Sequence, residues 1–268
     1  MNFTFKKWDE ICFFISQNFD TISAFQLKPN KFSNIIVIKH DVEDKPNNAL
    51  KLAKIENKYG INATYYFQGD LVVDNKKIIQ EIKELGHEIG YHYDVMDSNE
   101  GEYSDAIIEF SDYLNIFNDI GIVIMSVCPH GNPLKIRSNW SSNKDFFRSK
   151  EVQEKYSNIF DLSCHLPKIT KFSYISDAGY SWKLIDDFEE NDRLKTNDIQ
   201  IKDIFETISN SNKPLIISTH PHRWKKSLIS NFLRKIIFTL SKKIAKKLYK
   251  ISFLKRLINK FYYLARKI

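Results

Sequence analysis

Glycine, proline and cysteine are scarce in this chain of 268 residues, which contains 8, 7 and 3 of them. So little glycine and proline argues against collagen-like sequences and proline-rich linkers. Three cysteines without a Cys-x-x-Cys pair argue against a disulfide framework and a structural zinc knuckle. No apolar run approaches the roughly 20 residues that span a bilayer, and no small-residue cleavage site follows the first residues. We therefore expect a cytoplasmic protein.

Acidic residues are absent from residues 225–268, which contain 14 Lys and Arg. Residues 1–224 contain 26 basic and 33 acidic residues, so the net charge of +7 combines a body of about −7 with a tail of about +14. The chain is 43% hydrophobic and 14% aromatic, which is ordinary for a globular protein and argues against intrinsic disorder. We predict a globular domain over residues 1–224 and a separate tail over residues 225–268.

The tail repeats apolar residues at steps of three and four, with Lys and Arg between them, which predicts a basic amphipathic helix or two such helices broken near Ser252. A helix of this kind can lie on an anionic membrane surface. Its apolar side can instead pack on the acidic body or on another copy of the chain. Nucleic acid is the least favoured partner, because the tail contains no recognisable nucleic-acid-binding module.

The body alternates strand and helix patterns. Short β-branched or apolar runs predict strands at 34–39, 62–67, 88–92, 121–127 and 215–219. Amphipathic runs predict helices at 47–59, 74–85, 100–117 and 199–209, the first two ended by glycine. This alternation predicts an α/β fold built on a parallel sheet or barrel.

Histidine and carboxylate side chains gather where the predicted strands end. Six of the seven histidines lie in or beside these strand ends, and His165 is the exception. The segments concerned are His40–Asp41–Val42–Glu43, Gly86–His87 with His92–Tyr93–Asp94, Cys128–Pro129–His130 and His220–Pro221–His222. Because active sites of parallel α/β proteins lie at the carboxyl ends of the strands, we expect a metal or acid–base site there.

Several of these residues have a structural alternative. Asp41 could cap the helix that follows it. Glu43 should point the same way as Asp41, because side chains alternate along extended backbone, so the two carboxylates can share a cation or divide the acid–base and ligand roles. His87 begins its strand at the opposite end, where a structural hydrogen bond is an equal alternative.

Several motifs of the body resemble those of polysaccharide deacetylases, the carbohydrate esterase family 4 or NodB-homology fold. The resemblance rests on IIVIKHDVEDKPNNALKLAKIENKYGINATYYF and GHEIGYH, and on the divergent motifs CPHGNP, SSNKDFFR, YISDAGYSW and THPHRW. It covers residues 34–224 and leaves the tail outside. It implies a distorted (β/α) barrel of the polysaccharide deacetylase type.

The resemblance also implies roles for particular residues. Asp41 corresponds to the general base, and Glu43 to a metal ligand that is usually Asp in the family. His92 corresponds to the first ligand of a histidine pair whose second position is Met96, a poor ligand for such an ion. The third ligand must then come from elsewhere, with His130 as first candidate and His87 as second. His220 takes the place of the general acid.

The function implied is removal of an acetyl group from an N-acetylated sugar by a divalent metal ion, zinc being the preferred choice. Candidate substrate-binding residues are Asn132, Asp177, Trp182 and Trp224, of which Asp177 could instead orient a histidine and the tryptophans could belong to the core. A cytoplasmic substrate would be a lipid-linked or nucleotide-linked glycan precursor, with the tail at the inner membrane face. The alternatives are an inactive glycan-binding or scaffold protein and another metallohydrolase, such as a phosphoesterase.

Overall fold

The computed structural model describes residues 3–27, 34–132, 135–169, 171–185 and 199–230, with residues 232, 233, 236, 237 and 240. These residues contain a ten-stranded sheet of order β6-β5-β4-β3-β2-β10-β7-β8-β9, with β1 paired to the start of β2. The strands are β1 (Asp20–Thr21), β2 (Ile35–Val42), β3 (Ala63–Phe67), β4 (Glu88–Tyr93), β5 (Ser126–Pro129), β6 (Phe160–Asp161), β7 (Ser173–Ser176), β8 (Lys183–Ile185), β9 (Ile199–Gln200) and β10 (Leu215–Thr219).

Every pairing from β6 across to β7 is parallel, and β8 and β9 extend the sheet in antiparallel fashion. The predicted α/β class with a parallel sheet is therefore confirmed. Among the described residues the strand order has two ends, so the sheet is not closed into a complete barrel.

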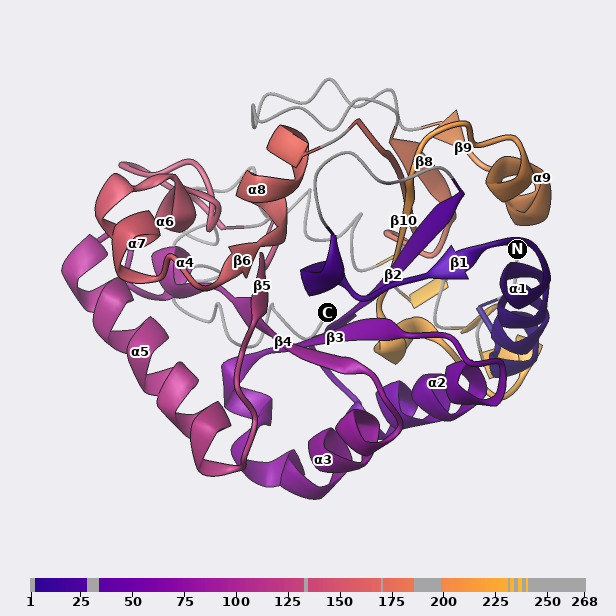
Figure 1. The fold of residues 1–268 in the computed structure, drawn as a ribbon, viewed down its shortest axis with the longest axis horizontal. Coiled ribbons are helices and arrows are strands. Elements are labelled where there is room, and N and C mark those ends of the chain that lie inside the picture. Colours follow the sequence, from indigo (N-terminus) through magenta and orange to yellow (C-terminus); the bar gives the residue numbers. More distant parts are fainter. Residues whose placement is uncertain are drawn as a thin grey trace.

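Helices of very different length connect the strands. The α-helices are α1 (Phe5–Asn18), α2 (Pro46–Lys58), α3 (Lys76–Glu84), α4 (Val95–Ser98), α5 (Tyr103–Asp119), α6 (Asp145–Arg148), α7 (Lys150–Lys155), α8 (Leu162–Ile169) and α9 (Ile204–Ser209). The 3₁₀ helices are η1 (Ala24–Gln26), η2 (Gly69–Leu71), η3 (Val73–Asn75) and η4 (Pro221–Arg223). Figure 1 shows α2, α3 and α5 following one another along the outer side of the sheet.

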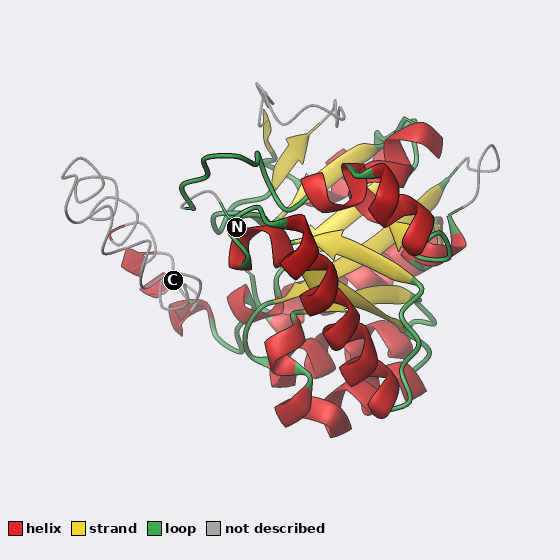
Figure 2. Ribbon diagram, turned by 90° about the vertical axis from the view of Figure 1, so that its left-hand side faces the viewer, coloured by secondary structure: helices red, strands yellow, loops and turns green. Residues whose placement is uncertain are grey.

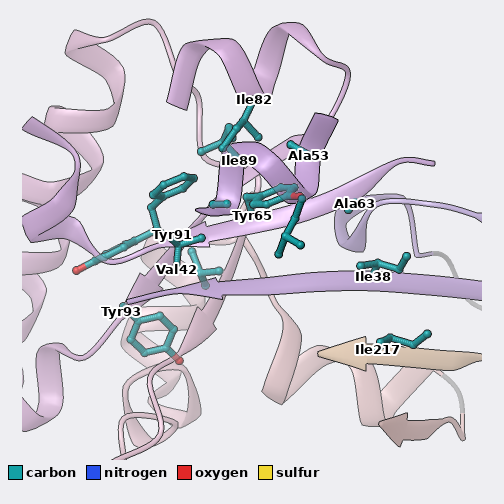
Figure 3. Close-up of a cluster of buried hydrophobic side chains, with 14 of the residues drawn as sticks. Ile38, Val42, Ala53, Ala63, Tyr65, Ile82, Ile89, Tyr91, Tyr93 and Ile217 are labelled. Carbon is teal, nitrogen blue, oxygen red and sulfur yellow. The ribbon is translucent and has the colours of Figure 1, made fainter. Parts of the chain in front are cut away.

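Side chains alternate along each strand, so one set faces the helices on the outer side and the other set faces the opposite, inner side. On β2, Ile36, Ile38 and Val42 join the main hydrophobic cluster beneath the helices, while Lys39 and Asp41 belong to the opposite face. The other parallel strands add further outer-face side chains to this cluster, and Figure 3 shows Tyr65, Tyr91 and Ile217 among them. The inner face carries the polar groups of the site together with a second, smaller hydrophobic cluster that includes Val37, Tyr66, Cys128 and Ile216.

The expected elements agree with the observed ones in order and type, but three boundaries were wrong. β2 continues to Val42, because it pairs with β10 and β3 through its polar end. β5 begins at Ser126 rather than residue 121, since its pairing with β4 starts only at Val127 and its pairing with β6 at Ser126. α9 begins at Ile204 rather than residue 199, because the Asp203 side chain accepts from the first-turn backbone N–H groups and caps the helix there.

Helix α1 is an element to which the sequence analysis assigned no structure. Its buried residues Trp8, Ile11, Cys12 and Ile15 recur at three- and four-residue spacing, and the helix packs against α2. The three cysteines are free and buried. Helix α1 is therefore part of the core.

A buried carboxylate joins α2 to the back of β2. Glu56 of α2 is fully buried and accepts hydrogen bonds from Trp8 Nε1 at 2.9 Å, from His40 Nε2 at 2.7 Å and from Tyr65 OH at 2.7 Å. Burial would raise the pKa of Glu56, but the charge and hydrogen bond of His40 and the neighbouring His87 and Tyr65 outweigh it and lower that pKa. The cluster fixes His40 on the outer face and so helps to hold the next residue, Asp41, on the inner one.

We expect Glu56→Gln to lower the free energy of unfolding by about 2–4 kcal/mol at neutral pH, because buried donors lose their charged acceptor. The folded-state pKa of Glu56 is depressed, so its contribution is present above the ordinary glutamate value and disappears as pH falls through the folded value. The difference between wild type and variant in urea denaturation should therefore shrink towards low pH. Glu81→Gln, which removes an exposed partner of Lys54, is the control and should change stability by less than about 1 kcal/mol. An equal loss of unfolding free energy in Glu56→Gln and Glu81→Gln would contradict the stabilising role of the buried Glu56 carboxylate.

The described residues of the predicted tail leave their apolar side chains exposed. Residues 228–230, 232, 233, 236, 237 and 240 are helical. The exposed side chains are Leu228, Ile229, Phe232, Leu233, Ile236, Ile237 and Leu240, each between 40% and 74% accessible. Figure 2 shows helical segments next to the chain terminus standing apart from the sheet and its helices. The rest of the predicted tail lies outside the described residues.

Within the part of the chain that the structure describes, no helix combines the length and apolar character needed to cross a membrane.

Candidate active site

The carboxyl end of β2 places two carboxylates on the inner side of the sheet. Asp41 is 6% exposed and pairs with Tyr66 of β3 across the sheet, and Glu43 follows the strand. Lys39, two residues before Asp41 and therefore on the same face, donates from Nζ to both Asp41 carboxylate oxygens at 2.7 Å. Burial would raise the pKa of Asp41, but the charges of Lys39, His92 and His220 outweigh it and hold that pKa well below its usual value.

Glu43 is the point where three histidines from distant parts of the chain meet. Its Oε1 lies 3.4 Å from Nε2 of His130, 3.7 Å from Nε2 of His92 and 3.9 Å from Nε2 of His220. Burial would raise the pKa of Glu43, but hydrogen bonds with His130 and His92 outweigh it and lower that pKa strongly. The structure therefore brings together Asp41, Glu43 and the three histidines that the sequence analysis placed at strand ends.

His92 is oriented by the neighbouring strand. Its Nδ1 lies 2.9 Å from the backbone carbonyl oxygen of Cys128, its direct partner on β5. A carbonyl oxygen can only accept, so Nδ1 carries a proton, and in the neutral ring Nε2, which faces Glu43, is the nitrogen with the lone pair. A hydrogen bond of this kind fixes both the ring orientation and the tautomer of metal-binding histidines.

Hydrogen bonds at both the N–H and the carbonyl group of its backbone hold His130 in place. Its N–H donates to the carbonyl oxygen of Tyr93 at 2.7 Å, and its own carbonyl oxygen accepts from Asn143 Nδ2 at 2.8 Å. The His130 and His92 rings meet edge to face with their centres 5.2 Å apart. His130 therefore reaches the site from the end of β5, next to the strand that carries His92.

The other candidate for third ligand, His87, lies elsewhere. It is buried at the start of β4, where its Nδ1 accepts from the Ala63 backbone N–H at 3.2 Å and its Nε2 donates to the Ala53 carbonyl at 3.0 Å. Met96 lies on α4 and is fully buried in the main hydrophobic cluster. His87 is thus a structural residue, and the helix after His92 directs an apolar side chain into the core.

Asp177 orients His220 from behind. It is fully buried and accepts from His220 Nδ1 at 2.6 Å, from the His220 backbone N–H at 3.0 Å and from Arg223 Nη1 at 2.8 Å. Burial would raise the pKa of Asp177, but Arg223 and His220 outweigh it and lower that pKa. The His220 ring consequently directs Nε2 towards the carboxylates, 3.9 Å from Asp41 Oδ2.

Three of the predicted substrate-binding residues need correction. Trp182 and Trp224 are 2% and 0% exposed and pack with Phe3, while Trp224 also contacts Trp8. Neither ring offers a face to a sugar, so both belong to the core. Asp177 is likewise buried behind His220, which favours the orienting role over direct sugar binding. Asn132 is half-buried two residues after His130, and its predicted contact with sugar hydroxyls stays a prediction.

The donor set at Glu43 suits a divalent metal ion. One ligand atom each from Glu43, His92 and His130 can be chosen so that all lie within 4.8 Å of one another. Two imidazole nitrogens and one carboxylate oxygen are a ligand set typical of catalytic zinc, which leaves at least one position open. The fixed Nε2 lone pair of His92 fits this use. A second group, Asp41, His92 and Cys128, meets the same distance criterion.

The fold and site thus define an α/β protein with a carboxylate–histidine cluster at the carboxyl edge of a parallel sheet, an arrangement suited to metal-assisted hydrolysis. The family model for polysaccharide deacetylase matches residues 30–111. This confirms the resemblance to polysaccharide deacetylases over the segment that contains Asp41, Glu43 and His92.

Solved structures with a similar course of the chain include three bacterial proteins. A family 4 carbohydrate esterase from Streptomyces lividans, in complex with acetate, is 14% identical; the match covers 77% of this chain and 88% of that one, with a TM-score of 0.44. A family 4 pseudoenzyme from Bacillus anthracis is 13% identical over 80% and 62%, with a TM-score of 0.43. The peptidoglycan deacetylase PdaC from Bacillus subtilis is 15% identical over 90% and 97%, with a TM-score of 0.41. The search of curated proteins finds no match.

Lys39 is the residue of this cluster that the sequence analysis missed. It stands inside the buried strand β2 and shares a face with Asp41, two residues later. A lysine in such a strand needs a buried partner, because an unpaired ammonium group is too costly to bury. The buried lysine could therefore have been noticed in the sequence. Side-chain alternation along the strand would have indicated Asp41 as its partner.

Proposed function

We propose that the protein is a metal-dependent hydrolase that removes the acetyl group from an N-acetylated sugar. The observation that carries the proposal is the convergence of Glu43, His92 and His130 within ligand distance, flanked by Asp41 and His220. Zinc is the metal we propose, since the donors are two imidazoles and one carboxylate. When bound, the metal lowers the pKa of water and polarises the acetyl carbonyl.

The chain's own residues then have complementary tasks. Asp41, ionised and held by Lys39, accepts a proton as a water oxygen attacks the acetyl carbonyl carbon. His220, held by Asp177, donates a proton from Nε2 to the nitrogen that leaves as the C–N bond breaks. The products are acetate and the free amino sugar.

Acetate release is the direct test. Zinc-loaded protein should release acetate from N-acetylglucosamine oligosaccharides or from a nucleotide-linked N-acetyl sugar, and chelator treatment should stop the reaction. Inorganic phosphate is measured in parallel with phosphate monoesters and diesters. Phosphate release without acetate would replace the deacetylase by a phosphoesterase. Sugar binding without any hydrolysis in zinc-, cobalt-, nickel- or manganese-loaded protein would favour a glycan-binding or scaffold role.

We further propose that the tail brings the enzyme to an anionic membrane surface at the inner face, where lipid-linked precursors of surface polysaccharide would be its substrates. Support comes from the exposed apolar residues between 228 and 240 and from the 14 basic residues without an acidic one in residues 225–268. Apolar burial and basic residues near the surface, at roughly 1 kcal/mol each, add to such binding.

Flotation of the full chain with vesicles of anionic phospholipid tests this proposal. Ile229→Asp, Phe232→Asp and Leu233→Asp together should lower the floating fraction by at least about tenfold, because they place charge in the apolar face. Val123→Asp with Ile108→Asp, which alters apolar side chains that are 66% and 59% exposed on the body, is the matched control and should float like wild type. Equal flotation of all three proteins would contradict membrane docking. A shift in oligomeric state confined to the tail variant would assign the face to a second copy.

A further inference from the structure

A buried ammonium group stands beside Asp41, inside the sheet. Lys39 is 2% exposed, and its Nζ contacts both Asp41 oxygens at 2.7 Å. The same Nζ lies 3.3 Å from Sγ of Cys128 and 5.7 Å from the centre of the Tyr66 ring. Carboxylate, sulfur and ring thus surround the ammonium group, which is the environment that a buried cation requires.

The side chains that Lys39 contacts also belong to a possible metal site. Asp41, His92 and Cys128 form the second group whose ligand atoms lie within 4.8 Å of one another. It contains a sulfur donor, and thiolate is a strong ligand for zinc and other transition metals. His92 belongs to both groups. An ion bound at Cys128 would therefore compete for His92 with the ion at Glu43, and it would also occupy Asp41.

Lys39 lies against the sulfur-containing group. Its Nζ contacts two of the three donors of the sulfur-containing group, Asp41 and Cys128. Its contacts with both Asp41 oxygens, at 2.7 Å, are those of a charged ammonium group paired with a carboxylate. A fixed positive charge between these donors repels a divalent ion, and the repulsion is strong in a buried site. Glu43 instead faces the imidazoles of His92, His130 and His220.

We propose that the Lys39 ammonium group is an internal cation that occupies the Asp41–His92–Cys128 group, keeps metal ions away from the Cys128 thiol and positions the Asp41 carboxylate. Lys39 is thus a positioning residue, acting through Asp41 and through the choice of metal site. The inference rests on the proposed function only for the statement that the metal belongs at Glu43, His92 and His130.

Cobalt(II) binding followed by absorption spectroscopy tests this inference without any substrate. A cobalt ion held by nitrogen and oxygen donors gives ligand-field bands, whereas a thiolate ligand adds a charge-transfer band in the near ultraviolet. Wild type should bind cobalt without the thiolate band, even in excess cobalt. Lys39→Met, which puts an unbranched side chain one atom shorter in its place and removes the charge, should raise that band by at least about tenfold per bound ion. The double variant Lys39→Met/Cys128→Ser should lose it again.

The outcomes separate this inference from the proposed function. A thiolate band in wild type, or its absence in folded, cobalt-binding Lys39→Met, overturns the role of Lys39 and leaves the Glu43 site untouched. No cobalt binding by wild type, together with thiolate-bound cobalt in Lys39→Met, removes the proposed metal site and supports the inference.

Removing one partner of a buried ion pair can unfold a protein. Should Lys39→Met not fold, Lys39→Met/Asp41→Asn replaces it, because the methionine then faces a neutral amide rather than an unpaired carboxylate. His92 and Cys128 remain as donors in this variant, so the thiolate band is expected there too. Its absence in the folded double variant would overturn the inference.

Discussion

Replacing His92 with alanine should abolish metal binding and reduce acetate release by at least about a thousandfold, because a metal ion contributes several kcal/mol to such a reaction. Wild type should contain close to one zinc, or another transition metal, per chain, and the variant almost none. His92 is 2% exposed, its Nε2 faces Glu43, and it belongs to both groups of possible ligands. No other single change removes a donor from both groups.

Elemental mass spectrometry on the purified proteins measures this effect without knowledge of the substrate. His87→Ala is the matched control, since it removes a buried histidine from the other end of the same strand, where the side chain bonds to the backbone of Ala53 and Ala63. It should lower thermal stability and retain the metal. Equal metal content in wild type and His92→Ala would remove His92 from the site. A wild type that stays metal-free after reloading with zinc, cobalt, nickel or manganese would refute the metallohydrolase mechanism.

Asp41→Asn should lower kcat by roughly 10²- to 10⁴-fold, the usual effect of losing a general base, while metal content stays near that of wild type. Measuring kcat and metal content together distinguishes a general base, whose loss lowers only kcat, from a metal ligand, whose loss lowers both. Glu43 rather than Asp41 is assigned as the ligand because it faces the imidazole nitrogens of His92 and His130, and because the Lys39 charge beside both Asp41 oxygens disfavours a metal ion there. The base role is then left to Asp41. The amide can still accept one hydrogen bond from Lys39, but it cannot take up the proton.

The variant leaves the Lys39 charge unpaired, so its folding must be checked by circular dichroism and kinetics measured well below its unfolding temperature. Asp161→Asn is the control, because Asp161 is equally buried but accepts from Tyr93 OH, Ser163 Oγ and the Cys164 backbone N–H. It should cost stability and leave kcat within a few-fold of wild type in the folded protein. Parallel loss of metal and activity in Asp41→Asn would make Asp41 a ligand instead.

The sequence predicted which polar side chains gather at one edge of the sheet better than it predicted the bounds of the elements around them. Asp41, Glu43, His92, His130 and His220 were expected at one edge of the sheet, and the structure brings them together. The reason is that parallel strands share one carboxyl edge, so a residue's distance from the end of its strand largely determines its neighbourhood. The boundaries of β2, β5 and α9 were less predictable, because backbone pairing and a helix cap determined where each element began or ended.

Aromatic residues were the weakest part of the sequence prediction. Trp182 and Trp224 follow strands and lie in motifs shared with the site, so they were candidates for stacking on a sugar. Their burial against Phe3 depends on the first residues of the chain, where the Phe3 carbonyl oxygen accepts from the Lys225 backbone N–H at 2.9 Å. Contacts between segments so far apart leave no periodic signal in the sequence.

By itself the sequence determined the α/β class, the order of the main strands and helices, the clustering of polar groups at strand ends and the abrupt change of charge at residue 225. These follow from local patterns: side-chain alternation, helical spacing and composition. Only the tertiary structure decided that His130 rather than His87 meets Glu43, that Asp177 stands behind His220, and that Lys39 lies between Asp41 and Cys128. Lys39 and Cys128 are 89 residues apart in the chain. Their contact depends on which strands pair and in which register, a property of the assembled sheet that no single segment contains.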